Sequence, residues 1–246
     1  MRVGTCPVSA LFYVIIKSDI ILHKVGTYVL ALLPCFLLMK IQNTIQKVLF
    51  IIYNIVKGGI HMESIRKQTN DFRNEHEVFN FKNILENIEQ SIEKFGIKVL
   101  YSDMSTFDSP DAISGYSRIN EIGTPEIVVN AHHSKERRRF TMAHELGHIV
   151  LHWKWPNYTA NAKYSILYRN DLSEEADSER EKEANEFAAQ LLAPLDIIKR
   201  VLPHDIKDYS DYDINILSVK MAKAFKISKQ FAWRQLKKLK EVEEVS

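Results

Sequence analysis

Cysteine is nearly absent from this sequence. Its 246 residues include 2 cysteines, Cys6 and Cys35, and no cysteine follows Met62. Disulfide bonds therefore cannot hold the larger part of the chain together, and a reducing cytosol suits that composition. Internal repeats and low-complexity tracts are missing too. The length allows one medium domain with appendages and a sizeable hydrophobic core.

Apolar runs of the length that a membrane span needs are also missing. "VGTYVLALLPCFLLM" (25–39) and "VLFIIYNIV" (48–56) are strongly apolar, but Pro34 interrupts the first, and neither reaches the ~18–20 uninterrupted residues of a spanning helix. A signal peptide fits poorly, because Lys17 and Asp19 break the first apolar run of the chain and no small-residue cleavage site follows it.

Charge divides the chain unevenly. Residues 1–61 carry 6 Lys or Arg and 1 acid, a net charge of +5, whereas the rest carries 27 basic and 30 acidic residues, a net charge of −3. The tripeptide Lys57–Gly59 can be encoded by a purine-rich sequence of the kind that bacterial ribosomes pair with shortly before a start codon. We therefore predict that translation starts at Met62 and that 1–61 is an AT-rich leader read in frame. A membrane anchor and a soluble extension are the alternatives for 1–61.

Helix and strand signals follow one another after Met62. Isoleucines recur at helical spacing within 79–96, and Gly96 is a natural residue to follow a helix. The run 97–104 is strand-like. "YSRI" and "EIVVNA" have the pattern of a hairpin, with its turn around Gly123 and Pro125. The sequence therefore predicts a helix followed by a small group of strands.

Two long helices are predicted next. Ser134 is a suitable N-cap for a helix that runs through "KERRRFTMAHELGHIVLHW" and ends at Pro156. A polar loop at about 157–172 separates it from the second helix, "SEREKEANEFAAQLL", which stops at Pro194.

The first of these helices carries the pattern H-E-x-x-H. His144 and His148 are four residues apart, so they lie one turn apart on the same helical face. Two imidazoles in that arrangement can bind one Zn²⁺ at about 2.0–2.1 Å. Glu145 points past such a metal, where its carboxylate can take a proton from water as general base of a hydrolysis. A satisfied pair of core histidines is the alternative, but both rings share the inward, apolar face, where polar groups need partners.

A third ligand is expected from the second helix, because catalytic zinc usually has three protein ligands and an open position. Helical angles place Glu181 at the edge of the apolar stripe, whereas Glu183 and Glu186 point away from it. We therefore predict Glu181 as the ligand, Glu183 as the runner-up, and Asn185 as a hydrogen-bond partner of a ligand. A capping box from Ser178 to Glu181 is the metal-free alternative. A solvated helix face is the expectation for Glu183 and Glu186.

His152 continues the four-residue series of histidines. It lies ~12 Å along the helix axis from His144, too far to share a metal with it. Packing or a hydrogen bond to a ligand is its expected role. We predict one Zn²⁺ per chain rather than iron or manganese, because two histidines and a glutamate with an open position are the common hydrolytic arrangement of zinc.

The stretches "VVNAHHSKERRRFTMAHELGHIVLH" and "EKEANEFAAQLLAP", in this order, resemble the ImmA/IrrE family of zinc metallopeptidases. The resemblance covers most of 62–203. It implies a zincin-like (thermolysin-like) metallopeptidase core of the α+β class, mostly helical with a small antiparallel or mixed sheet, which agrees with the predicted elements. It also implies that His144, His148 and Glu181 bind zinc and that Glu145 is the catalytic base.

Members of that family are typically bacterial and cytoplasmic, are often encoded on mobile elements, and cleave a helix-turn-helix repressor to release transcription. The resemblance therefore implies a cytoplasmic endopeptidase whose partner is a protein of that class. The apolar leader departs from the family pattern, and membrane anchoring through 1–61 is the alternative localisation. The strand "EIVVN" can align an extended substrate by β-addition, with ordinary core sheet as the alternative. Tyr164, Tyr168 and His204 are loose candidates for stabilising the transition state.

The segment 214–240 carries 8 Lys or Arg and no acid. A helix to Phe225, a turn at Lys226–Ser228 and a second helix resemble a helix-turn-helix, although Lys226 stands where glycine is usual. Its cations can contact DNA phosphates, which would make the chain a DNA-binding or protein-binding regulator with a non-catalytic zinc site. We favour a helical pair packed on the peptidase core, because relatives of the family carry a similar segment. The predicted organisation is a leader (1–61), a zinc metallopeptidase domain (62–203) and a basic helical segment (204–246).

Overall fold

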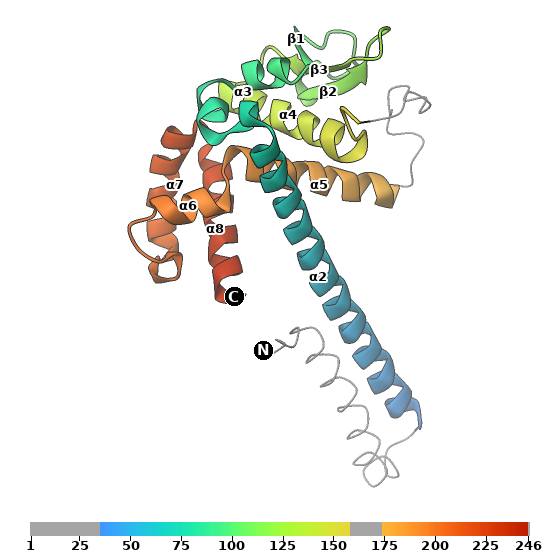
Figure 1. Ribbon diagram of the computed structural model, residues 1–246. Coiled ribbons are helices and arrows are strands. Elements are labelled where there is room, and N and C mark those ends of the chain that lie inside the picture. Colours follow the sequence, from blue (N-terminus) through green and yellow to red (C-terminus); the bar gives the residue numbers. More distant parts are fainter. Residues whose placement is uncertain (1–34, 158–173, 246) are drawn as a thin grey trace, which may run out of the picture. The chain divides into compact units, whose positions relative to one another are not determined.

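The computed structural model describes residues 35–157 and 174–245 (Figure 1). The chain divides into two compact units, Met1–Gly59 and Ile60–Ser246, and helix α2 (Cys35–Glu75) crosses the boundary between them. Within the described ranges, no helix combines the length and the apolar character of a membrane span. The domain boundaries predicted from the sequence stay predictions.

A three-stranded mixed sheet lies against helix α4 (Lys135–Gly147) in the second unit (Figure 1). Its strands are β1 (Lys98–Ser102), β2 (Gly115–Ile119) and β3 (Pro125–Asn130). The central strand, β3, is parallel to β1 and antiparallel to β2, and all of its residues are buried. The prediction that "EIVVN" can accept a substrate strand is therefore wrong, because both edges of β3 are already paired. Helix α4 contacts both the central strand β3 and the edge strand β2.

The predicted hairpin is confirmed, and its turn has a clear cause. Gly123 takes a φ of 83°, which glycine adopts without steric cost. Asn120 Oδ1 accepts hydrogen bonds from the backbone amides of Ile122 and Thr124 at 3.2 and 2.9 Å. This Asn-centred turn sets the register in which β2 lies beside β3.

The helices that carry the predicted site also form, with one different boundary. Helix α3 (Phe81–Lys94) precedes β1, and Ser134 caps α4 by accepting a hydrogen bond from the backbone amide of Arg137 at 3.2 Å. A π-helical turn, η4 (His148–His152), continues α4; in it the Trp153 amide donates to the His148 carbonyl at 3.1 Å.

Helix α5 (Glu174–Leu192) begins before the predicted start. Ser178 lies inside this helix, where its neighbours already have helical partners, so the capping box from Ser178 to Glu181 is wrong. The turn that precedes Ser178 extends the helix, and its single apolar residue, Ala176, is too little for periodicity to detect.

The C-terminal part is helical, and its predicted break is confirmed. Its elements are α6 (Leu195–Val201), η5 (Ile206–Asp208), α7 (Asp211–Phe225) and α8 (Lys229–Val245). Lys226 takes the left-handed conformation with a φ of 54°, as the glycine usual at this position would.

One hydrophobic core joins these elements within the second unit. It includes isoleucines of α3, aliphatic residues of β3, and side chains of α4, α5 and α8: Ile84, Ile88, Ile92, Ile127, Val129, Leu146, Phe187, Leu191, Leu236 and Leu239. Helices α4 and α5 lie side by side along this core (Figure 1).

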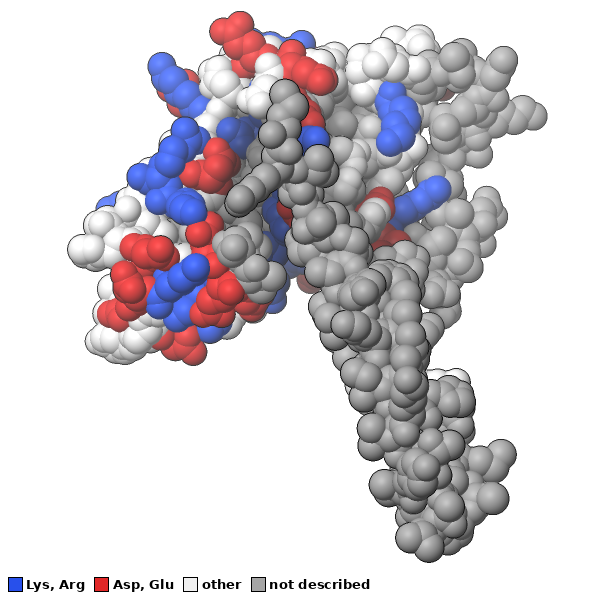
Figure 2. Space-filling model, turned by 60° about the horizontal axis from the view of Figure 1, so that its bottom comes forward, with Lys and Arg blue, Asp and Glu red and all other residues white. Residues whose placement is uncertain are grey.

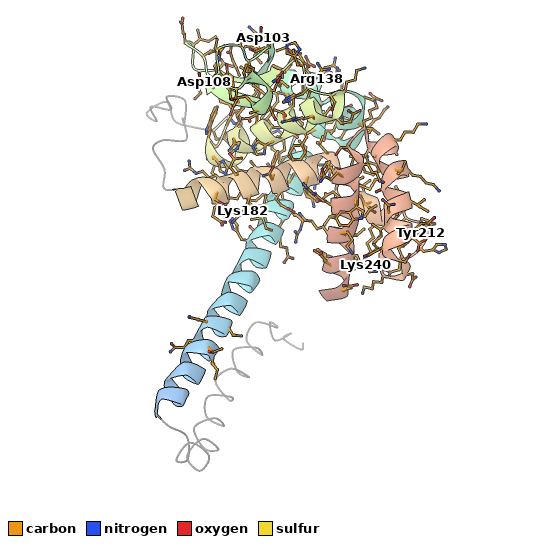
Figure 3. All side chains as sticks on the ribbon, turned by 180° about the vertical axis from the view of Figure 1, so that it is seen from behind. Asp103, Asp108, Arg138, Lys182, Tyr212 and Lys240 are labelled. Carbon is orange, nitrogen blue, oxygen red and sulfur yellow. The ribbon has the colours of Figure 1, made fainter. Side chains whose placement is uncertain are left out.

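Two arginines near the start of α4 tie that helix to its surroundings. Arg138 lies over the Tyr101 ring of β1, 5.5 Å from its centroid (Figure 3). Arg139 donates to the carbonyl oxygens of Ile84 in α3, at 3.2 Å, and of Lys226 in the α7–α8 turn, at 3.1 Å. The helix that carries H-E-x-x-H is therefore held by the sheet, by α3 and by the C-terminal pair.

Candidate metal centre

Two glycines let neighbouring elements approach α4 closely. A Cβ atom on Gly147 would lie 3.2 Å from Ala184 Cα of α5, and a Cβ atom on Gly115 would lie 2.5 Å from Thr141 Cγ2. The first distance is tighter than ordinary packing and the second is a clash. Glycine at these positions brings α5 against one side of α4 and β2 against another, and both neighbours contribute side chains to the site.

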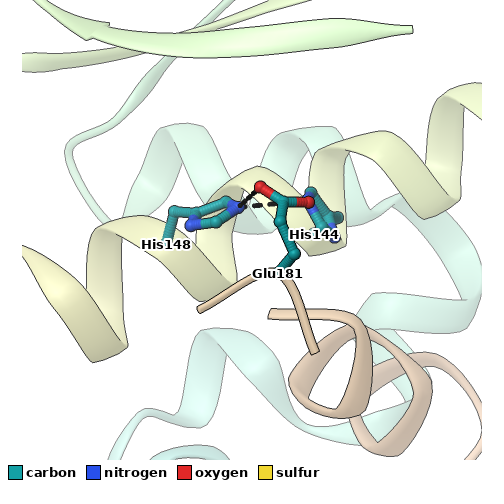
Figure 4. A group of neighbouring side chains, drawn as sticks. All are labelled: His144, His148 and Glu181. Atoms are coloured by element: carbon teal, nitrogen blue, oxygen red, sulfur yellow. Dashed lines mark hydrogen bonds and ion pairs between the residues drawn. The ribbon is translucent and has the colours of Figure 1, made fainter. Parts of the chain in front are cut away.

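The side chains of His144 and His148 meet Glu181 of α5 (Figure 4). The Nε2 atoms of the two histidines lie 3.1 Å apart. Glu181 Oε2 is 3.3 Å from His144 Nε2, and Glu181 Oε1 is 3.2 Å from His148 Nε2. One ligand atom from each residue therefore lies within 4.8 Å of the others, and this is the only such group among the described residues.

This donor set fits a zinc ion. Zinc accepts imidazole nitrogen and carboxylate oxygen at about 2.0–2.2 Å, and catalytic sites use three protein ligands. The Glu181 side chain is 38% exposed, whereas those of His144 and His148 are 15% and 17% exposed. The two histidines are therefore largely buried, and the cluster is accessible from solvent on the Glu181 side.

The close contacts of the cluster shift the pKa values of Glu181 and His144 in opposite directions. Hydrogen bonds donated by His144 and His148 hold the pKa of Glu181 well below its usual range. Burial lowers the pKa of His144, but the hydrogen bond to Glu181 and the charge of Glu145 outweigh burial, so this pKa ends above its ordinary value. Protons and metal cations therefore compete for His144.

The second ring nitrogen of each histidine has its own partner. His144 Nδ1 lies 3.1 Å from Asn185 Oδ1, and His148 Nδ1 lies 3.0 Å from His152 Nδ1. His152 Nε2 lies 2.8 Å from Glu183 Oε2. Burial lowers the pKa of His152 to about 4, so its ring is neutral near pH 7. The role expected for His152, a hydrogen bond to a candidate ligand, is the role it has here.

The prediction of a solvated face at Glu183 and Glu186 is wrong. Glu183 also lies 2.6 Å from His61 Nε2 of α2. Glu186 is 6% exposed and forms ion pairs with Arg66 of α2, at 3.3 Å, and with Lys238 of α8. Helical angles located the apolar stripe of α5, but they contain no information that α2 and α8 cover its other sides.

Glu145 is held by the sheet. Its carboxylate accepts a hydrogen bond from Ser117 of β2 at 2.9 Å, and the residue is 8% exposed. Sequence reasoning missed Ser117, because a serine inside a strand carries no motif and its partner depends on how β2 lies over α4.

The residues considered for stabilising the transition state gain no support. Tyr164 and Tyr168 lie outside the described residues. His204 is exposed, and its ring lies 6.4 Å from that of Tyr209, beyond α6.

Comparison with known protein families decides the assignment. Residues 92–237 match the model of the IrrE N-terminal-like domain, peptidase family M78. The chain belongs to this family. The M78 match confirms the resemblance seen in the sequence, and it implies a metallopeptidase-like fold for the mixed sheet and surrounding helices. No curated protein matches the chain in sequence. An M78 chain with this cluster of two histidines and a glutamate has the features of a zinc metallopeptidase.

Proposed function

We propose that this M78 chain is a zinc-dependent endopeptidase that cleaves a helix-turn-helix transcriptional repressor and thereby relieves repression. The observation that carries the proposal is the cluster of His144, His148 and Glu181 with the carboxylate of Glu145 beside it. A purely structural zinc site has no use for Glu145. The repressor substrate follows from the resemblance to the ImmA/IrrE family.

Zinc, Glu145 and Ser117 have separate roles in the proposed hydrolysis. Bound zinc supplies Lewis-acid polarisation of a water molecule and of the scissile carbonyl. Glu145 takes a proton from the water as its oxygen attacks the carbonyl carbon, and it delivers that proton to the amine nitrogen as the C–N bond breaks. Ser117 donates a hydrogen bond to Glu145 and so limits the orientations of its carboxylate.

The position of strand β2 is suited to aligning an extended substrate. It pairs with β3 along one edge, and Ser117 in its middle reaches Glu145. A peptide added along the other edge of β2 would be held by main-chain hydrogen bonds and would pass next to the general base.

Contacts of the C-terminal helices support a role in packing on the peptidase core. Lys237 donates to Asp211 at 2.8 Å, and Lys238 pairs with the buried Glu186 of α5. Figure 2 shows acidic and basic side chains intermixed on the side of the molecule where α7 and α8 lie. A stripe of cations free for DNA phosphates is the pattern that a DNA-binding regulator would need.

The metal content of the purified full chain is the first test. Elemental analysis after dialysis against metal-free buffer should find about one zinc per chain, as expected for a site with three protein ligands. The zinc-loaded chain is then incubated with helix-turn-helix repressors from the same cell, and mass spectrometry searches for new N-termini. Glu145→Gln should keep the zinc and cleave at least ~100-fold more slowly.

Two results would contradict the proposal. A folded chain that takes up no zinc removes the peptidase chemistry. Cleavage by Glu145→Gln at the rate of the unmodified protein removes the assigned role of Glu145. Salt-dependent binding to duplex DNA without any cleavage would instead favour a regulator with a non-catalytic site.

A further inference from the structure

His152 and Glu183 take no part in the proposed hydrolysis, yet they are closely arranged behind the cluster. The His152 side chain is 7% exposed, and both of its ring nitrogens lie within hydrogen-bond distance of a partner. Glu183 lies 2.8 Å from His152 Nε2 and 2.6 Å from His61 Nε2. These side chains form an unbroken series of contacts from His148 to helix α2.

Metal binding would set the direction of each hydrogen bond in this series. His148 presents Nε2 to the cluster, so as a neutral ligand it carries its proton on Nδ1. It donates that proton to His152 Nδ1, which must then be an acceptor. His152 consequently carries its own proton on Nε2 and donates it to Glu183, whose ionised carboxylate only accepts. Each group takes the one role that its neighbour leaves to it.

We propose that Glu183, acting through His152, is a positioning residue that holds His148 in the ring orientation and tautomer that bind metal, with His61 as an outer partner. This inference rests on the metal site of the proposed function. A carboxylate behind a ligating histidine orients the ring and raises the basicity of the ligand nitrogen. Here a second imidazole lies between the carboxylate and the ligand.

The two histidines of the cluster differ in this respect. The neutral amide oxygen of Asn185 contacts His144, whereas the contacts behind His148 lead through His152 to the carboxylate of Glu183. Loss of that carboxylate should therefore weaken metal binding through His148 and leave the His144 side in place.

Zinc affinity of the full chain tests this inference, measured by competition with a chromophoric chelator. Glu183→Ala removes both the acceptor and the charge, and we expect it to weaken zinc binding about 10–100-fold. Glu183→Gln keeps an acceptor oxygen and should lose less. His61→Ala should also lose less than Glu183→Ala, because the His61 side chain is 41% exposed.

Glu179→Gln is the matched control. Glu179 lies on the same helix, its side chain is 51% exposed, and it pairs with Lys182, which is exposed as well (Figure 3). Its zinc affinity should equal that of the unmodified chain. A folded Glu183→Ala chain that binds zinc as tightly as the unmodified one overturns the inference and leaves the proposed peptidase intact. An unmodified chain that binds no zinc overturns both.

The protonation pattern provides a readout that needs no variant. Heteronuclear NMR of the imidazole nitrogens in the zinc-loaded full chain should find the His148 proton on Nδ1 and the His152 proton on Nε2. A His152 ring that is protonated on Nδ1 instead would overturn the proposed direction of the hydrogen bonds.

Discussion

The two halves of helix α5 hold their carboxylates in opposite ways. Toward the C-terminal end, Glu186 is buried between Arg66 and Lys238, two side chains that are permanently cationic. Toward the N-terminal end, Glu181 faces two histidines and has no Lys or Arg within ion-pair distance among the described residues. Helix α5 therefore carries one carboxylate that has Lys and Arg counterions, Glu186, and one that has none of them, Glu181.

The difference separates a structural ion pair from a binding site. A buried carboxylate between fixed cations is already neutralised and fastens α5 to its neighbours. A carboxylate beside imidazoles contributes negative charge and lone pairs that converge on one point, and a divalent cation satisfies both. The residue types opposite a glutamate thus indicate its role better than its burial does.

Metal removal should have the largest effect, because it acts on the Glu181 half of the helix and leaves the Glu186 ion pairs in place. Zinc at about 1,000 times its Kd should raise the free energy of unfolding by ~4 kcal/mol, because it binds the folded chain. The check is denaturant unfolding of the full chain with zinc and with excess chelator. Equal stability in the two conditions would rule out a zinc site at Glu181.

The substitution Glu186→Gln should affect only the structural half. It leaves Arg66 and Lys238 without their shared carboxylate, and we expect a loss of about 1–3 kcal/mol in the free energy of unfolding. Urea unfolding in excess chelator measures this loss, and Glu179→Gln, in an exposed pair worth at most ~0.5 kcal/mol, is the control. Unchanged zinc affinity in Glu186→Gln completes the separation, and a drop in affinity comparable to that of Glu183→Ala would contradict it.

Lowering the pH should weaken the stabilisation by zinc gradually, through the proton on His144. The raised pKa of His144 means that the metal-free folded chain binds this proton more tightly than the unfolded chain does. That contribution is full below the unfolded pKa of about 6.5 and is lost as pH rises through the folded pKa. Zinc must displace the same proton, so its stabilising increment should shrink by up to ~1.4 kcal/mol per pH unit as pH falls below the raised pKa.

The measurement is the zinc-dependent difference in unfolding free energy between pH 8 and pH 5.5. This difference should be smaller at pH 5.5 than at pH 8, in the unmodified chain and in Glu186→Gln alike. An increment that stays constant over this interval would show that zinc does not compete with a proton on His144.

Local signals were enough for much of the fold. Ser134, the four-residue spacing of the histidines and the turn around Gly123 and Pro125 each act within a few residues, so α4 and the hairpin could be predicted. The family resemblance implied the α+β class and a small antiparallel or mixed sheet, and the order of these elements agreed with it. The early start of α5 could not be predicted, because a single alanine in its first turn is too little to mark an apolar face.

The parts of the site that escaped prediction all depend on distant segments. Ser117 reaches Glu145 across 28 positions of the chain, and His61 reaches Glu183 across 122. The central place of β3 is set by pairing with β1, which the hairpin pattern does not contain. Motif spacing identifies groups that share one helix, and packing decides which groups from elsewhere join them.

The π-helical turn after α4 makes chain length a functional variable. An i→i+5 hydrogen bond encloses one residue more than the α-helical bond, and here it spans His148 to Trp153. Deleting one residue between His148 and His152 would leave H-E-x-x-H intact but bring a different side chain behind the metal ligand. When homologous chains are aligned, a gap at this turn would thus mark a peptidase that supports its second histidine in another way.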